Sequence, residues 1–208
     1  MSSRSPDTPS SAQAALEADL RQAVLDGDMA RVDALAFSAP LDDDFRFELI
    51  GGVIAAADDA PLVTRLIDSA DGGVTPTAFV NYLAKAAAQG HAQTALYMQE
   101  QCIEAGIAAS ECRERILKNA PAEKLVPLVS AMDRAAPGKN IAAEMMLYAA
   151  MHDRHDSLAA LVKTGASTAG HGGMIIMMLL EDRKTHFAEP DKKQEYLSLL
   201  SSVMQLSA

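Results

Sequence analysis

A short pattern recurs five times along this chain: an alanine-rich helix end, a helix-breaking residue, and a second apolar stretch. The breaking residues are evenly spaced along the sequence, at Gly27, Asp58, Gly90, Pro121 and Asp153. Apolar side chains follow each break after five and eight residues: Val32/Leu35, Val63/Leu66, Ala95/Met98, Val126/Val129 and Leu158/Leu161. A fixed period of roughly 30 residues is typical of helical hairpins that stack in chain order, because one hairpin alone cannot bury its apolar face. The pattern predicts an all-α solenoid of about five helix-turn-helix repeats.

The boundaries of this array follow from where the periodicity starts and stops. Residues 1–11 are polar and rich in Ser and Pro, which predicts a disordered N-terminus. Helical periodicity then runs through residues 12–167. It is broken in residues 168–208, where we expect capping helices with one face turned to water.

Composition and charge exclude some classes of binding partner. Aromatic residues make up 4% of the chain, Trp is absent, and the alternation of apolar and polar residues expected of strands is missing, all of which favours closely packed helices. The net charge of −10, without a local basic patch, opposes binding to nucleic acid or to an anionic membrane surface. No apolar run reaches the roughly 18 residues that a membrane span requires. We therefore expect another protein as the partner, with no inference about the oligomeric state.

The repeat resembles the ankyrin repeat, in degenerate form, over about residues 14–167. Three segments carry the likeness. Residues 86–91 (AAAQGH) and 23–28 (AVLDGD) are similar to the family's small-residue, Gly-containing helix junction, and residues 161–167 (LVKTGAS) to its Leu-Leu-x-x-Gly-Ala-Asp ending. Thr75-Pro76 matches half of the Thr-Pro-Leu-His tetrapeptide, and Thr77-Ala78 departs from the other half. The resemblance implies a protein-binding scaffold, and a different helical-hairpin array remains the alternative.

Few residues suggest chemistry. His152 and His155, with Asp153 and Asp156, have side chains that can bind zinc, but their spacing matches no established zinc motif. Cys102 or Cys112 with His91 has the residue types of a thiolate–imidazole nucleophile, without a flanking motif.

The absence of a secretory signal points to reduced thiols in a cytoplasmic protein. We expect no enzymatic activity, no catalytic residue, no metal and no cofactor. A hydrolase or transferase that uses His152/His155 or Cys102 is the alternative.

These observations favour a non-enzymatic protein–protein interaction module. The alanine-, arginine- and aspartate-rich composition, with a Ser/Pro-rich start like that of type III effectors, suggests a bacterial adaptor in the cytoplasm or an effector secreted into a host cell without a Sec signal. An immunity-type protein that neutralises a basic partner is a further alternative. Partner contacts are expected at outward positions of the first helices and at the short turns before them. The residues nominated are Phe45, Arg46, Tyr82, Lys85, Tyr148 and His152.

Overall fold

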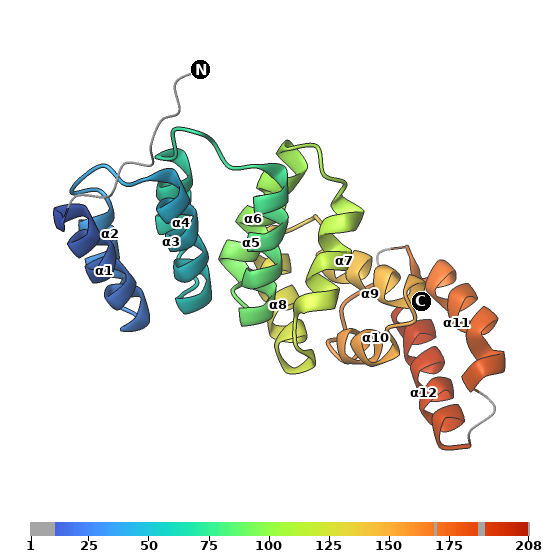
Figure 1. Ribbon diagram of the computed structural model, residues 1–208. Helices are drawn as coiled ribbons and strands as arrows, with labels where there is room; N and C mark the ends of the chain where they lie inside the picture. The colour runs from blue at the N-terminus through green and yellow to red at the C-terminus, as the bar shows by residue number, and fades with distance from the viewer. Residues whose placement is uncertain (1–10, 169, 187–189, 208) are drawn as a thin grey trace. The chain divides into compact units, whose positions relative to one another are not determined.

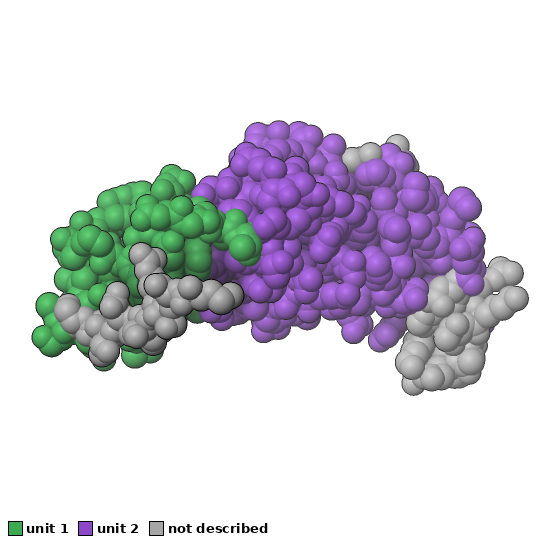
Figure 2. All heavy atoms as spheres, turned by 45° about the horizontal axis from the view of Figure 1, so that its top comes forward, with its two compact units in different colours: residues 1–75 green, residues 76–208 purple. Residues whose placement is uncertain are grey.

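The computed structural model describes residues 11–168, 170–186 and 190–207, without the side chains of residues 182–192. Within these ranges the chain forms twelve α-helices and no strand, so the all-α prediction is confirmed. Of the predicted disordered segment 1–11, only Ser11 is described, and it begins the first helix. The chain divides into two compact units, residues 1–75 and 76–208 (Figure 2), which are described separately below. The sequence pattern does not predict this boundary.

Unit 1 consists of two helical hairpins. Its helices are α1 (Ser11–Leu25), α2 (Met29–Ala36), α3 (Asp43–Ala56) and α4 (Ala60–Asp68). Helix α1 packs against both α2 and α3, and α3 packs against α4. The core between them is aliphatic, with Leu20, Val32, Ile50 and Leu66 completely buried.

Unit 2 consists of four hairpins that pack on one another in chain order (Figure 1). The helices are α5 (Pro76–Gln89), α6 (Ala92–Glu104), α7 (Ala109–Asn119), α8 (Ala122–Ala135), α9 (Ile141–Met151), α10 (His155–Val162), α11 (Gly172–His186) and α12 (Pro190–Leu206). The first helices contact in the order α5, α7, α9, α11, and the second helices in the order α6, α8, α10, α12. Each hairpin therefore buries one face against the next, which is a helical repeat-like arrangement.

The predicted period appears directly in the helix boundaries. The second helices of the first five hairpins begin at Met29, Ala60, Ala92, Ala122 and His155, which are almost evenly spaced in the sequence. The corresponding first helices begin at Ser11, Asp43, Pro76, Ala109 and Ile141, and their spacing is equally regular. The breaks that the sequence indicates are thus the turns within the hairpins.

Three of these turns share one backbone conformation. Gly27, Gly90 and Asp153 each have positive φ, at 70°, 78° and 53°. In each turn the next residue donates its amide hydrogen to a carbonyl five residues earlier, as in His91 N to Ala86 O at 3.0 Å. This is the Schellman ending of an α-helix, which requires a left-handed residue after the helix. The other two turns instead pass through an extended alanine, Ala57 or Ala120.

The start of α9 is capped by a side chain from the preceding hairpin. Asn140, the residue before α9, makes no side-chain capping bond. Instead, Asp133 in α8 accepts hydrogen bonds from Ile141 N at 2.7 Å and Ala142 N at 3.3 Å. The carboxylate satisfies amide hydrogens that have no partner inside α9 and lies at the positive end of its dipole. One hairpin therefore supplies the cap for the next.

Candidate functional site

A groove on unit 2 crosses two successive hairpins. It has a volume of about 430 Å³ and is lined by residues of α7, of α9 and of the turn after α9: Ser110, Glu111, Glu114, Arg115, Lys118, Tyr148, Met151 and His152. We call it the α7–α9 groove. Arg113 of α7 is 5% exposed and forms an ion pair with Glu144 of α9, which links the two helices that supply the walls of the groove. The groove therefore depends on the packing of neighbouring hairpins and does not exist in one hairpin alone.

The groove combines charges of both signs with apolar surface. Lys118 Nζ pairs with Glu114 Oε1 at 2.5 Å, one helical turn apart. The pKa of the Glu114 carboxyl is lowered by its hydrogen bond to Lys118, and the nearby His152 acts in the same direction. Tyr148 is half-buried, whereas Met151 is 49% exposed. A tyrosine ring and a flexible thioether beside charged groups are the side-chain types that recur in protein interfaces.

The structure brings two of the six predicted partner-binding residues together. Tyr148 and His152 both line the α7–α9 groove. Lys85 is exposed on α5 but does not line the groove. The prediction that Phe45, Arg46 and Tyr82 lie at outward positions is wrong, because they are only 6%, 8% and 8% exposed.

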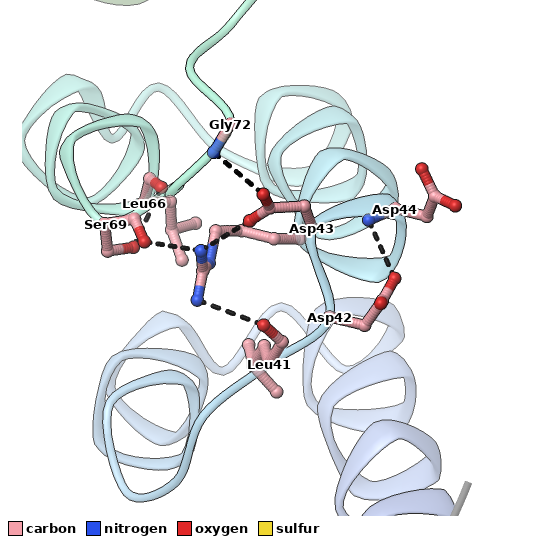
Figure 3. A network of polar contacts seen from close by, with 8 residues as sticks. Leu41, Asp42, Asp43, Asp44, Leu66, Ser69 and Gly72 are labelled. Carbon is pink, nitrogen blue, oxygen red and sulfur yellow. Dashed lines mark hydrogen bonds and ion pairs between the residues drawn. The ribbon is translucent and has the colours of Figure 1, made fainter. Parts of the chain in front are cut away.

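Arg46 is buried because unit 1 uses its guanidinium to hold two loop segments (Figure 3). Its Nη1 donates to Asp43 Oδ1 at 2.9 Å and to the carbonyl of Ser69, and its Nη2 donates to the carbonyl of Leu41 at 3.3 Å. The other carboxylate oxygen of Asp43 accepts from Gly72 N at 2.9 Å. This network joins the residues before α3 to the residues after α4, so the side chain is not available to a partner.

Phe45 and Tyr82 are buried for different reasons. The guanidinium of Arg21 lies 4.7 Å from the centre of the Phe45 ring, and Arg21 is held there by an ion pair with Glu48 at 2.9 Å. The Phe45 ring is thus covered by a side chain of the neighbouring helix. Tyr82 is buried in unit 2, and this burial raises the pKa of its phenol to about 12.

A second hollow, which we call the α10–α12 hollow, has a volume of about 450 Å³ in unit 2. Its lining residues are Ala120, Ala122, Asp153, Arg154, His155, Asp156, Ser157, Ala159, Glu195, Tyr196 and Leu199. His155 makes an edge-to-face contact with Tyr196, with ring centres 6.2 Å apart. His155 therefore lines this hollow, whereas His152 lines the α7–α9 groove. In the described ranges, no group of three or more His, Cys, Asp or Glu side chains is arranged to hold a metal ion.

The structure does not assemble the thiolate–imidazole pair considered from the sequence. Cys102 and Cys112 are both buried free thiols, and they hydrogen-bond to each other. This bond, together with burial, raises the pKa of the Cys102 thiol, whereas the bond lowers the pKa of the Cys112 thiol. His91 precedes α6, and Cys102 lies near the other end of that helix, which corresponds to about 16 Å along the axis at 1.5 Å per residue.

Sequence reasoning missed the α7 wall of the groove. Its side chains lie on the opposite side of α7 from the buried Cys112, Ile116 and Leu117. The signal was present as a polar stripe with helical spacing, Glu111, Arg115 and Lys118. Such a stripe is also what any solvated helix face shows, so the spacing alone does not separate the two cases.

Comparison with protein-family models, curated proteins and solved structures finds no match to this chain. None of the described helices combines the length and the apolar character needed to cross a membrane. The features that bear on function are therefore the packing of the hairpins, the α7–α9 groove and the distribution of charge.

Proposed function

We propose that this protein is a non-enzymatic protein–protein interaction module that binds its partner in the α7–α9 groove. The observation that carries the proposal is the convergence of Tyr148, Met151 and His152 with the polar stripe of α7 across two successive hairpins. Repeat proteins bind through surfaces of this kind, since side chains of adjacent repeats line one continuous face. The separation of His91 from the thiols, and of His152 from His155, supports a binding role over the hydrolase or transferase alternative.

We also propose that the hairpins of unit 2 form a solenoid of ankyrin-like repeats. Two features support this interpretation. The hairpins pack first helix on first helix and second helix on second helix, and the junctions at residues 86–91 and 149–154 adopt the same Schellman turn. A bacterial adaptor or a secreted effector remains the expected biological setting. If export to a host cell is unchanged when residues 1–11 are deleted, the effector version loses its sequence support.

The groove is tested by a matched pair of charge substitutions. Met151→Glu places a carboxylate in the groove, whereas Leu25→Glu makes the same change of charge at an exposed position of unit 1 that lines neither the groove nor the hollow. Both tagged variants and the unchanged chain are used to capture partners from lysate, followed by mass spectrometry. We expect Met151→Glu to lose a protein that the other two chains retain. If all three chains capture the same proteins in equal amounts, the α7–α9 groove is not the binding site.

An acidic surface that neutralises a basic partner is a second candidate, favoured by one observation. Asp153, Asp156 and Glu195 all line the α10–α12 hollow and are exposed. Binding there would weaken steeply with salt, because screening acts strongly on exposed charges. The hollow has an excess of carboxylates, since Arg154 is the one Lys or Arg that lines it. In the α7–α9 groove two carboxylates are balanced by Arg115 and Lys118, so binding there is expected to depend less on salt.

A further inference from the structure

Two cysteines from neighbouring hairpins lie in direct contact inside unit 2. Cys102 is the third residue from the end of α6, and Cys112 is the fourth residue of α7. Their thiol groups hydrogen-bond to each other, and both residues are buried, at 0% and 1% exposure. The binding role proposed above uses neither side chain. A pair of free thiols in contact has a chemistry of its own, because it can be oxidised to a disulfide.

The connection between α6 and α7 fixes where the two cysteines meet. At the end of α6, Ile107 N donates to the carbonyl of Cys102 at 2.9 Å, and Gly106 has φ of 87°, which is again a Schellman ending. At the start of α7, Cys112 N donates to the carbonyl of Ala108 at 3.2 Å. Each cysteine therefore takes part in the backbone hydrogen bond that fixes one end of the connection.

The surroundings make the two sulfurs unequal. The bond from Cys102 lowers the pKa of the Cys112 thiol and the guanidinium of Arg113 acts in the same direction, whereas burial and Glu111 oppose them. Within the described residues, Nε and Nη1 of the buried Arg113 have no hydrogen-bond partner, so its ion pair with Glu144 leaves two donors uncommitted. The pKa of the Cys102 thiol is raised by the same bond and by burial. Because the thiolate is the nucleophilic form of cysteine, Cys112 is the sulfur that reacts first.

We propose that Cys102 and Cys112 form a reversible disulfide when the protein meets hydrogen peroxide, and that this bond clamps the hairpin α5/α6 to the hairpin α7/α8. The Cys112 thiolate attacks one peroxide oxygen, so that an S–O bond forms, the O–O bond breaks and the departing hydroxide takes up a proton. The sulfur of Cys102 then attacks the sulfenic sulfur of Cys112. The S–S bond forms, the S–O bond breaks, and hydroxide leaves with the Cys102 proton as water. The two thiols together lose two electrons, and peroxide is reduced to two molecules of water.

Contact and burial together select this reaction and this oxidant. A disulfide holds its sulfurs about 2 Å apart, and thiols that are already hydrogen-bonded need only a small movement to reach that separation. The connection beside them is exposed at Gly106 and Ala108, so a local opening there admits a small, uncharged oxidant. Hydrogen peroxide is both small and uncharged. The inference does not rest on the proposed partner binding.

The test treats the folded, full-length chain with an excess of hydrogen peroxide, alkylates the remaining thiols in denaturant and maps the peptides by mass spectrometry. We expect a cross-link between Cys102 and Cys112 within one chain, reversed by dithiothreitol. The oxidised chain should unfold at a temperature about 5 °C higher than the reduced chain, because the bond restricts the unfolded state. An unchanged or lower unfolding temperature would show that the disulfide does not clamp the hairpins.

Two matched substitutions distinguish the roles of the sulfurs, since each removes one thiol from the same contact. In Cys102→Ser the reaction should stop at a sulfenic acid on Cys112, which dimedone traps. In Cys112→Ser the remaining thiol has the raised pKa, so its oxidation should be about tenfold slower or more. Equal rates in the two variants contradict the assignment of Cys112 as the first sulfur to react.

The unchanged chain alone decides the proposal if either variant alters folding. Thiols that stay reduced in the folded chain, while the same peroxide oxidises the chain unfolded in urea, would show an inert buried pair. That result overturns the proposal. So does a product in which each cysteine is oxidised separately and no cross-link forms.

Discussion

The burial of Arg46 illustrates how a charged side chain can be committed to the fold. Its guanidinium satisfies the carbonyls of Leu41 and Ser69 and one oxygen of Asp43. Removing it leaves a carboxylate and two carbonyl groups without their donor in a partly buried place. Buried polar groups that lose a partner destabilise a protein more than the bond itself stabilised it.

Arg46→Ala is therefore expected to lower the free energy of unfolding by about 2–3 kcal/mol. Arg31→Ala provides the control, because Arg31 pairs with Asp19 on the surface, where both side chains are well exposed. That substitution should change stability by less than about 1 kcal/mol. Urea denaturation followed by circular dichroism measures both. Equal effects would mean that the network around Arg46 contributes no more than a surface pair.

The burial of Tyr82 should make the protein less stable in alkaline solution. Burial raises the pKa of its phenol to about 12, above the ordinary value of 10.0. Between these two values the folded chain keeps a proton that the unfolded chain has lost, so stability falls as pH rises. The full contribution, about 2–3 kcal/mol, is present below pH 10 and is lost by about pH 12. In Tyr82→Phe, the free energy of unfolding should fall less steeply over this range. An absorbance titration of Tyr82→Phe should also lack a tyrosinate component that forms near pH 12 in the unchanged chain.

At the scale of elements, three of the hairpin turns share one backbone conformation. Asp153 occupies the position held by Gly27 and Gly90 in two other hairpins, with φ of 53°. A side chain at positive φ is strained, whereas glycine is not. We expect Asp153→Gly to raise the free energy of unfolding by about 0.5–1 kcal/mol, since the released strain exceeds the added freedom of the unfolded chain.

Gly90→Ala is the converse experiment at the equivalent turn. Gly90 has φ of 78°, and an added Cβ would lie 3.3 Å from Lys124 Cβ. Backbone strain and crowding act together, so we expect a loss of about 1–2 kcal/mol. Thermal unfolding of both variants against the unchanged chain measures the two effects. If both substitutions changed the free energy of unfolding in the same direction, backbone strain at positive φ would not explain the stability of this turn.

The helices and their turns were predictable because local chemistry determines them. Gly27 and Gly90 mark helix ends by their positive φ, and Pro121 requires an extended residue before it. The burial of individual side chains was harder to predict from the sequence. In α3 the buried side is broad and includes the charged Arg46 beside Phe45 and Leu49, whereas Asp44 and Glu48 are exposed. Residue type alone therefore does not mark the outward face of this helix. Which of its residues meet solvent depends on how neighbouring helices pack, and a repeat period carries no information about that.

Part of the candidate site was likewise predictable from the sequence, and part was not. Tyr148 and His152 were found because the first helix of a hairpin was expected to present outward residues to a partner. Tyr148 lies on α9, and His152 follows its last residue. Their partners in the groove come from α7, which belongs to the preceding hairpin. Only the packing of α7 on α9 brings the two sets together. The ion pair between Arg113 and Glu144 that supports this packing has no signature in either helix alone.

At the scale of the whole molecule, the two compact units predict separable folding. Unit 2 contains four hairpins that bury their apolar faces against one another. A chain of residues 76–208 should therefore be helical by circular dichroism and should unfold in one cooperative transition. A fragment that begins at residue 109 lacks α5 and α6 and leaves the faces of α7 and α8 uncovered, so it should be less stable. An unfolded 76–208 chain would show that the unit depends on residues outside it.

The cap that Asp133 provides has a consequence for synthesis on the ribosome. The aspartate is translated before Ile141 and Ala142, whose amide hydrogens it accepts. When these residues leave the exit tunnel, α8 can already offer its carboxylate, and the first turn of α9 has a template on which to form. The hairpin that is already folded thus helps the next helix to form. The hairpins would be added from the N-terminal to the C-terminal end, which is the direction of translation.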